Sequence, residues 1–409
     1  MNTLYITYDG LLDPLGKSQV LPYIDGVRDL SDTFHIISFE KASKSETDLE
    51  EMQDLLSKKN ISWTHLRFSS SQSLFAKLSD ILSLYFSIFR IIFSKKIDLI
   101  HARGLPSAST GLFFKRIFKI KLIFDFRGLW ADERVTKGGW DLSKLIHKLQ
   151  YRFFKHRETS LFQEADVVIV LTEKVLDDIL LKNEIDKSKF TVIPCAADFE
   201  LFNINISNNT LKQSLEIDKN HFVIGYLGSI GPMYQFKAYL KLLSKLNEKG
   251  VSTIGLIATN DTILAKKAIN DFEENILQNK VIIRNALRAE VPKYLNIMDA
   301  LVAFYSIKYS VISVSPTKIG EALACGVPII CNAGIGDTDL IIKKLDAGYI
   351  FNDLTDDSID SFVRLKYFPF KKDKQALRDS SKDIFDLKIA IKRYRSAYQS
   401  VFKQNDKII

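Results

Sequence analysis

A lysine and a glutamate lie three residues apart in "SPTKIGEALACGVPII", residues 315–330, and their spacing suits the binding of an anionic ligand. Ser315 is expected to cap a helix whose first residue is Pro316, because a proline there loses no hydrogen bond. The N-terminal end of a helix attracts negative charge, and Lys318 lies in the first turn. The segment therefore predicts an anion site at Lys318, with Glu321 on the next turn.

Two glycine-containing loops accompany this helix and suit the same chemistry. "GYLGSIGPMY" (residues 225–234) places Gly228 directly after a strand-like run, and "AGIGD" (residues 333–337) follows another. Gly326 is expected to end the helix between them. Backbone N–H groups in such turns face anions readily. Three anion-binding loops in one half of the chain favour a ligand that carries a diphosphate.

A separate loop in the first half of the chain, "YDGLLDPLGKSQVLPY" (residues 8–23), follows the first strand. Gly16 permits a close backbone approach, and a helix that begins near Ser18 is predicted to hold a phosphate or an acceptor. The alternative interpretation is a plain turn between a strand and a helix. The loop lacks the G-x-G-x-x-G pattern, so the dinucleotide fingerprint is absent.

Charged side chains also gather in "FDFRGLWADE", residues 124–133, after another predicted strand. Asp125 and Arg127 are expected at the carboxyl end of that strand. Charged side chains at such a position more often have a function than charged side chains in a protein core. A buried ion pair is the alternative. His101, at the end of a neighbouring strand, is interpreted only as a lining residue.

Short apolar runs that alternate with helical patterns are expected to position these loops. The expected strands are residues 3–9, 34–40, 97–102, 121–126, 165–172, 222–228, 252–258, 280–285, 299–305, 327–332 and 347–351. Such alternation is typical of βαβ units and parallel sheets. The sequence therefore predicts two α/β domains with a cleft between them.

The length of 409 residues also favours two domains. The predicted boundaries are residues 1–198 for the N-terminal Rossmann-like, acceptor-binding domain and 221–373 for the C-terminal, ligand-binding one. A polar linker is expected at 199–220. Helices at 374–409 are expected to cross back to the first domain.

The composition points to a reduced, cytosolic setting. The three cysteines lie in or beside apolar runs, which does not suit a disulfide framework. The N-terminus does not resemble a signal peptide, and no long apolar run is free of charge. No metal-binding motif is evident, and neither a P-loop nor a G-x-S-x-G motif is present.

Positive charge is concentrated in residues 74–121, which hold nine Lys/Arg and two Asp among many aromatic and aliphatic residues. A buried amphipathic helix with solvated ends is one interpretation. The other is a helix that lies on an anionic membrane surface. Nucleic acid is not an expected partner, because no recognised binding motif accompanies the charge.

Several segments in order resemble the retaining glycosyltransferases of family 4, which have the two-domain GT-B fold. The likeness is carried by "SPTKIGEALACGVPII", "GYLGSIGPMY", "VIPCAADFELF" and "EVPKYLNIMDALVAFY". The loop "YDGLLDPLGKSQVLPY" resembles that of bacterial surface-polysaccharide members. The resemblance implies two Rossmann-like parallel-sheet domains that face a central cleft. It also implies sugar transfer, with retention, from a nucleoside diphosphate sugar of the UDP or GDP type to a glycan or lipid-linked acceptor.

The resemblance assigns provisional roles to residues. Glu321 matches the second glutamate of the E-x7-E motif and is expected to hold the ribose. The expected donor-binding residues are Gly228, Ser229, Arg284, Ser315, Thr317, Lys318, Glu321, Gly334 and Gly336. The expected acceptor-binding residues are Asp9, Gly16, Lys17, Gln19 and His101. The expected catalytic residues are Asp125, Arg127 and Lys318. Neither a metal nor a cofactor is expected.

Three positions depart from the family pattern. Ser313 stands at the first glutamate of E-x7-E, Ser229 replaces a common arginine, and Asp125 with Arg127 follows the strand where many members carry a histidine. Two alternatives stay open: a nucleotide-sugar 2-epimerase on the same fold, and a non-catalytic nucleotide-sugar-binding subunit. The preferred prediction is a metal-independent hexosyltransferase of capsule, O-antigen or exopolysaccharide biosynthesis. Its expected location is the cytoplasm or the inner face of the cytoplasmic membrane.

Overall fold

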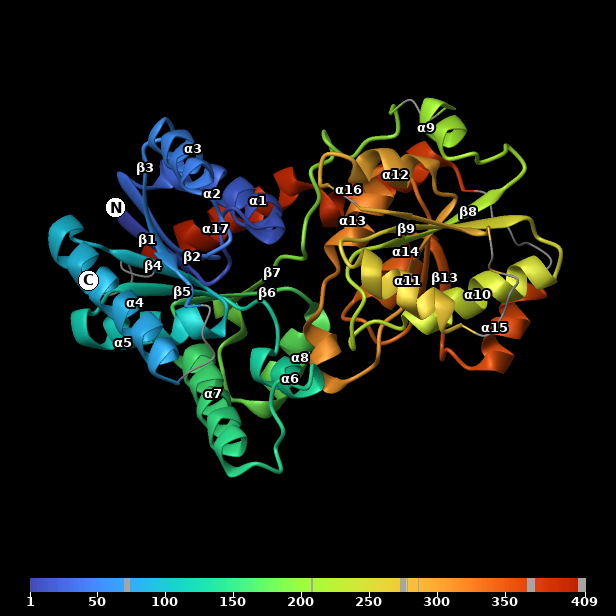
Figure 1. The fold of residues 1–409 in the computed structure, drawn as a ribbon. Helices are drawn as coiled ribbons and strands as arrows, with labels where there is room; N and C mark the ends of the chain where they lie inside the picture. Colours follow the sequence, from blue (N-terminus) through green and yellow to red (C-terminus); the bar gives the residue numbers. More distant parts are fainter. Residues whose placement is uncertain are drawn as a thin grey trace. The chain divides into compact units, whose positions relative to one another are not determined.

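The structure of the protein is a computed structural model that describes residues 1–69, 74–206, 209–272, 277, 279–285, 287–365 and 372–403. The chain forms two compact units (Figure 1). Unit 1 consists of residues 1–194 and 390–409, and unit 2 consists of residues 195–389.

Unit 1 is built on a seven-stranded parallel sheet with the strand order β3-β2-β1-β4-β5-β6-β7. Its strands are β1 (Asn2–Thr7), β2 (Thr33–Glu40), β3 (Ile61–Arg67), β4 (Leu99–Arg103), β5 (Lys121–Asp125), β6 (Val167–Val170) and β7 (Phe190–Val192). Its helices are α1 (Pro14–Gln19), α2 (Leu21–Asp25), α3 (Glu46–Ser57), α4 (Leu74–Lys95), α5 (Leu105–Phe118), α6 (Trp130–Thr136), α7 (Leu145–Glu164) and α8 (Glu173–Lys182). Two short 3₁₀ turns, η1 (Arg28–Leu30) and η2 (Lys187–Lys189), complete the unit.

Unit 2 contains a six-stranded parallel sheet with the order β10-β9-β8-β11-β12-β13. Its strands are β8 (Phe222–Leu227), β9 (Thr253–Ala258), β10 (Val281–Arg284), β11 (Ala300–Ala303), β12 (Ile329–Asn332) and β13 (Gly348–Phe351). Its helices are α9 (Asn209–Ser214), α10 (Phe236–Glu248), α11 (Thr262–Asn270), α12 (Val291–Ile297), α13 (Thr317–Ala324), α14 (Thr338–Lys344), α15 (Asp356–Val363) and α16 (Lys374–Phe385). A 3₁₀ turn, η4 (Tyr309–Ser313), precedes α13, and the last helix, α17 (Leu387–Lys403), continues into unit 1.

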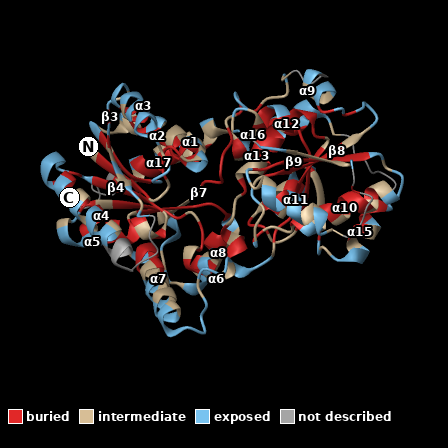
Figure 2. Ribbon diagram, in the orientation of Figure 1, coloured by how far each residue is buried: buried red, intermediate tan, exposed pale blue. Residues whose placement is uncertain are grey.

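Two Rossmann-like parallel sheets therefore confirm the predicted fold class. The central strands are buried on both faces, as β9 shows along its whole length, and helices cover each sheet (Figure 2). Continuous apolar runs such as "TIGLIA" fit this environment, because a parallel strand in the middle of a sheet has no solvent-facing side.

Two strands were missing from the prediction, and both lie at an edge of the unit 1 sheet. β3 alternates buried with exposed or half-buried residues, because one side of this edge strand faces solvent. β7 has only three residues, all half-buried. Neither strand carries the continuous apolar run by which the other strands were recognised.

The helices of unit 1 form two layers. Figure 1 shows α4, α5 and α7 on one face of the sheet, with α2, α3 and α17 on the other. Ring contacts between Tyr85 and Phe113 join α4 to α5, and Arg157 Nη2 joins α7 to α5 by donating to Ser109 O. Right-handed crossovers require this arrangement, since the connections after β3, β4 and β5 all run in one direction across the sheet.

Candidate functional site

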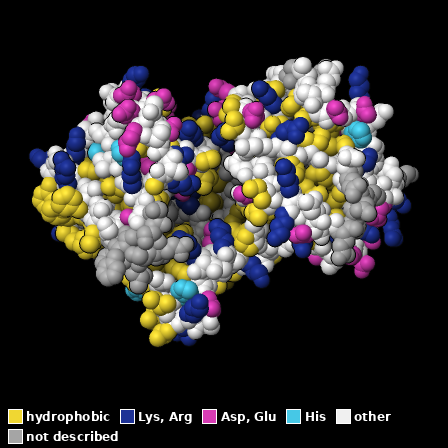
Figure 3. Space-filling view, in the orientation of Figure 1, with side chains coloured by type: hydrophobic (Ala, Val, Ile, Leu, Met, Phe, Trp, Pro, Cys, Tyr) yellow, Lys and Arg dark blue, Asp and Glu magenta, His cyan; other side chains and the backbone are white. Residues whose placement is uncertain are grey.

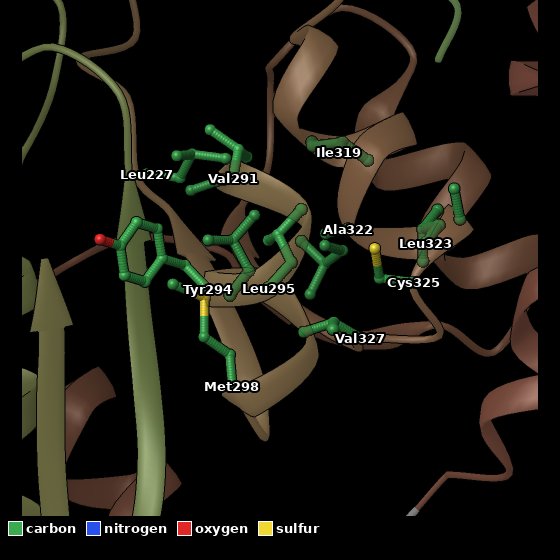
Figure 4. Packing of buried hydrophobic residues seen from close by; sticks show 14 of the residues in the cluster. Leu227, Val291, Tyr294, Leu295, Met298, Ile319, Ala322, Leu323, Cys325 and Val327 are labelled. Atoms are coloured by element: carbon green, nitrogen blue, oxygen red, sulfur yellow. The ribbon is translucent and has the colours of Figure 1, made fainter. Parts of the chain in front are cut away.

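Helix α13 is held in place by its apolar face. Ile319 and Leu323 are buried in one cluster with Leu295 of α12 and Leu227 of β8 (Figure 4). This packing leaves the polar residues of the first two turns to face the loops after the strands. The helix is therefore a rigid support for Lys318 and Glu321.

The prediction for α13 was correct at its C-terminal end and wrong at its N-terminal end. Gly326 has φ +65°, so the helix ends at a left-handed glycine as expected. The predicted start was wrong by one residue: α13 begins at Thr317, which is half-buried, and Pro316 precedes it with no side-chain cap. Ser315 Oγ instead accepts a hydrogen bond from Cys195 N at 3.1 Å, a tertiary contact that competes with capping.

Lys318 Nζ lies in a box of three aromatic rings. Its distances to the ring centroids are 4.8 Å for Tyr234, 5.4 Å for Tyr226 and 5.7 Å for Tyr305. A Cβ built on Gly228 would lie 3.1 Å from Nζ, so the structure brings these two predicted residues together. Cation–π attraction favours the ammonium group here. The buried Nζ nevertheless has no hydrogen-bond partner among the described residues.

Burial lowers the pKa of Lys318 to about 8, against an opposing effect of the Glu321 carboxylate. A buried ammonium that lacks hydrogen bonds costs free energy, because its hydration is only partly replaced. Titratable groups held in such a state are frequent at functional sites. An anion that accepted hydrogen bonds from Nζ would remove this cost.

Glu321 is bound to an arginine that the prediction did not include. Its Oε1 accepts from Arg288 Nη1 at 2.5 Å, and the Arg288 guanidinium lies 5.1 Å from the centre of the Phe202 ring. Arg284, one of the expected donor-binding residues, is exposed and donates to the carbonyl of its own neighbour, Ile283. The Glu321 carboxylate on α13 is therefore paired with Arg288, one helical turn from Lys318.

The other predicted donor-binding residues give less support for an anion site than Lys318 does. Ser229 is exposed. Gly334 has φ +90° and donates its N–H to Asp339 Oδ2 at 3.2 Å, while Gly336 N donates to Val311 O at 3.0 Å. These two N–H groups serve the internal structure of the loop.

Ser313, at the position of the first motif glutamate, is fully buried, and its Oγ donates to Ser310 O at 2.7 Å. It therefore shapes the turn η4 that leads into α13.

In unit 1, Asp125 lies at the centre of a buried network of charges. Its side chain is 0% exposed and lies 3.4 Å from both Arg103 Nη1 and Arg127 Nη1. Arg103 Nε also donates to Asp9 Oδ2 at 2.9 Å. Tyr394 of α17 donates its hydroxyl to Asp125 Oδ2 at 3.2 Å. The two carboxylates and two guanidinium groups balance one another in charge.

This balance determines how Asp125 titrates. Burial alone would raise its pKa, but the charges of Arg127 and Arg103, together with the nearby His101 ring, hold the pKa well below its usual range. Asp125 is thus a fixed anion that orients Arg127.

His101 is also enclosed. Its Nδ1 lies 2.8 Å from the hydroxyl of Tyr398, and its Nε2 lies 3.7 Å from Asp125 Oδ2. Burial lowers the pKa of His101, which favours the neutral ring. The residue is 1% exposed, so it supports the network from within.

The loop after β1 is a closely packed turn. Glu40 is buried, and its carboxylate accepts from Leu11 N at 2.7 Å and from Leu12 N at 3.3 Å. A Cβ on Gly16 would lie 2.0 Å from Gly10 O. The loop geometry thus depends on a glycine at position 16 and on a buried carboxylate that the sequence analysis missed.

The predicted helix start near Ser18 was wrong, because α1 begins at Pro14. Lys17 is exposed on this helix, whereas Gln19 is buried and accepts a hydrogen bond from Tyr23 at 3.2 Å. Among the predicted acceptor side chains, Asp9 and Lys17 are therefore the accessible ones: the Asp9 side chain is 38% exposed.

Replacing Gly16 with alanine is expected to destabilise unit 1 by about 1–3 kcal/mol, since the methyl group would overlap backbone atoms that cannot move independently. Urea unfolding measures this change. Gly231→Ala is the matched control, because nothing lies within 4 Å of a Cβ built at that position. Equal midpoints for the two variants would contradict the packing argument.

Across the described residues, no group of three or more His, Cys, Asp or Glu side chains is placed to hold a metal ion. None of the described helices is long and apolar enough to cross a membrane.

Comparison with protein families places both parts of the chain. Residues 34–201 match the family model of Glycosyltransferase Family 4, and residues 207–364 match that of Glycosyl transferases group 1. Each family model matches less than half of the chain, and together the two matches extend over most of it. A Bacillus subtilis (strain 168) protein, "Putative teichuronic acid biosynthesis glycosyltransferase TuaH", is 22% identical over 210 residues, 51% of this chain. The chain matches half the length of this relative.

Solved structures share the GT-B fold over nearly the whole chain. Anabaena Alr3699/HepE, in complex with UDP and glucose, has a TM-score of 0.68 at 13% identity and covers 98% of this chain and 100% of its own. A glycosyltransferase from Rickettsia africae has a TM-score of 0.66 at 18% identity and covers 98% of each chain. At these identities the likeness concerns the fold.

Sequence reasoning missed Arg288, the three tyrosines around Lys318 and the buried Glu40. Arg288 lies four residues after the predicted Arg284, and it could have been recognised as a cation shortly before α12. The tyrosines left no signal of their own, since aromatic residues next to strands are ordinary core residues.

Proposed function

We propose that this protein transfers a sugar from a nucleoside diphosphate sugar, of the UDP or GDP type, to a glycan or lipid-linked acceptor. The observation that carries the proposal is the ammonium of Lys318, buried without a hydrogen-bond partner among the described residues and one helical turn from Glu321. A diphosphate would supply the missing acceptors, and Glu321 would take the ribose hydroxyls. Arg288 would then give up part of its contact with Glu321.

The reaction proceeds with retention in this proposal, by a front-face displacement in which Lys318 stabilises the departing diphosphate. Asp125 is fully buried and paired with two arginines, so it does not suit the role of a nucleophile that forms a covalent glycosyl intermediate. Its role is to position Arg127 and, through Arg103, the acceptor-binding carboxylate of Asp9. The anomeric configuration of the product, read by NMR, tests the stereochemistry.

The biological setting in this proposal is the assembly of a bacterial surface polysaccharide at the inner face of the cytoplasmic membrane. The teichuronic acid relative supports the pathway class, and the UDP complex of HepE supports the donor class. The basic and aromatic side chains that α4 exposes, within residues 74–121, are proposed to face anionic lipid.

Thermal stabilisation by a panel of nucleoside diphosphates and nucleotide sugars tests the donor site. A ligand at about 100 times its dissociation constant should add roughly 2.7 kcal/mol of stability. Glu321→Ala is expected to lose the shift, and Lys293→Ala, an exposed change on α12, should retain it. EDTA should leave the shift unchanged, since protein cations neutralise the diphosphate in this proposal. If no ligand stabilises the parent protein, the donor site is refuted.

A further inference from the structure

The first three turns of α7 carry apolar side chains that are more than half exposed. Figure 1 shows this end of the helix projecting beyond the rest of unit 1. The exposed residues, here called the α7 ridge, are Leu145 (72% exposed), Ile146 (54%), Leu149 (54%) and Phe153 (56%). Residues 145, 149 and 153 recur every four positions, which places them along one side of a helix.

The opposite side of α7 anchors the helix to unit 1. Phe154 packs against Trp130 at a ring distance of 4.8 Å, and Tyr151 donates to Asp132 Oδ1 at 2.8 Å. Lys155 Nζ also donates to Asp132, at 3.0 Å. These contacts hold the helix on unit 1 through side chains other than those of the ridge.

Positive charge surrounds the ridge. Residues 142–157 contain five Lys/Arg and no Asp or Glu. Lys155 is bound inward, and Arg157 donates to α5, but Lys148 and Arg152 are exposed beside the ridge. The protruding end of α7 is thus both apolar and cationic.

A second surface of the same kind lies on the same layer of unit 1. α4 exposes Leu82 (60%), Phe86 (70%) and Phe93 (63%) together with Arg90 and Lys95. Figure 3 shows hydrophobic side chains gathered at the left edge of the molecule, where α4 lies, and again at the bottom over the projecting end of α7. Because α4, α5 and α7 cover one face of the sheet, the two surfaces belong to the same side of unit 1.

We propose that the α7 ridge inserts into the headgroup region of an anionic lipid bilayer and forms, with the exposed side of α4, a two-point membrane contact. The apolar side chains would enter the acyl boundary while Lys148 and Arg152 bind lipid phosphates. The inference rests on the membrane location in the proposed function and adds the residues that make the contact.

Charge and shape distinguish this occupant from a second copy of the chain. Two α7 ridges brought together would place Lys148 and Arg152 of each copy near those of the other, which is repulsive. A projecting ridge also suits a deformable bilayer, whereas a protein partner would need a matching groove. An anionic lipid surface is complementary to both the charge and the shape of the α7 ridge.

Co-sedimentation of the full chain with vesicles tests the inference. The parent should bind vesicles of phosphatidylcholine with about 30% phosphatidylglycerol and bind pure phosphatidylcholine much more weakly. Leu145→Ser/Leu149→Ser/Phe153→Ser is expected to lower the partition coefficient on the anionic vesicles roughly tenfold or more. Phe153→Trp should retain binding, because tryptophan is favoured at the membrane interface.

Leu181→Ser/Ile263→Ser is the matched control, since these side chains are 86% and 82% exposed outside α7 and α4. It should bind as the parent does. Unchanged binding of the triple variant would overturn the inference, as would equal binding to neutral vesicles. A dimer in light scattering that the triple variant abolishes would identify a second copy as the occupant and also overturn it. Thermal stabilisation by nucleoside diphosphates should be the same in all variants. A failure of the proposed donor site can therefore be distinguished from a failure of the membrane contact.

Discussion

Replacing Lys318 with methionine should make the ligand-free protein more stable and its donor site inactive. Methionine is unbranched and only one atom shorter than lysine, and it can pack against the rings of Tyr226, Tyr234 and Tyr305. It removes a buried ammonium whose pKa is lowered by burial to about 8. The expected gain in unfolding free energy at pH 7 is on the order of 1–3 kcal/mol.

The same substitution should abolish stabilisation by nucleoside diphosphates and lower turnover by about a hundredfold or more, as for the loss of one group that stabilises developing charge. Lys343→Met is the matched control, an exposed change on α14 expected to stay within about 0.5 kcal/mol of the parent. Retained ligand stabilisation in Lys318→Met would contradict the assignment of the diphosphate site.

The pH dependence of the parent provides an independent measure of Lys318. Its pKa is about 8 in the folded protein and 10.5 without perturbation, so the unfolded chain binds more protons between these values. The unfolding free energy of the parent relative to that of Lys318→Met should therefore rise with pH across this window. The stability advantage of Lys318→Met at pH 7 should shrink by pH 10. Affinity for a nucleoside diphosphate should fall above about pH 8, because the neutral amine no longer attracts the phosphates. Urea unfolding and calorimetric titration from pH 6.5 to 10 measure both trends.

The fold was predictable because its strands carry a local signal. Buried parallel strands such as β9 are continuous apolar runs, and the helices between them have their own period. The signal fails at the two edges of the unit 1 sheet, where β3 is partly exposed and β7 is very short. The helix α13 was predicted with a cap at Ser315, but that hydroxyl bonds to a residue 120 positions away. No local pattern reports such a contact.

The candidate site was predictable only in part for the same reason. Lys318 and Glu321 lie on one helix, so their spacing alone indicated a joint role. The environment that makes Lys318 unusual comes from Tyr226, Tyr234 and Tyr305, which three different segments bring together. Likewise, the sequence placed Asp125 near Arg127, but Arg103 and Tyr394 join them only through the fold.

Asp125→Asn should destabilise unit 1 strongly. Both Arg103 and Arg127 lie 3.4 Å from the Asp125 carboxylate, and the amide would leave their buried charges in excess. Loss of one partner in a buried charge network costs about 3–5 kcal/mol. Urea unfolding at pH 7 measures the loss, and Asp177→Asn, an exposed change on α8, should stay within about 0.5 kcal/mol of the parent.

A second variant separates charge imbalance from simple loss of packing. Asp125→Asn/Arg127→Met removes one charge of each sign, so it should recover part of the stability that Asp125→Asn loses. Because the pKa of Asp125 is held below its usual range, its contribution is complete above about pH 4 and is lost as the pH falls toward the folded-state pKa. The gap between the parent and Asp125→Asn should therefore narrow in acid. A double variant as unstable as the sum of the single changes would mean that Asp125 and Arg127 act independently. The network would then not be what orients Arg127 toward an acceptor.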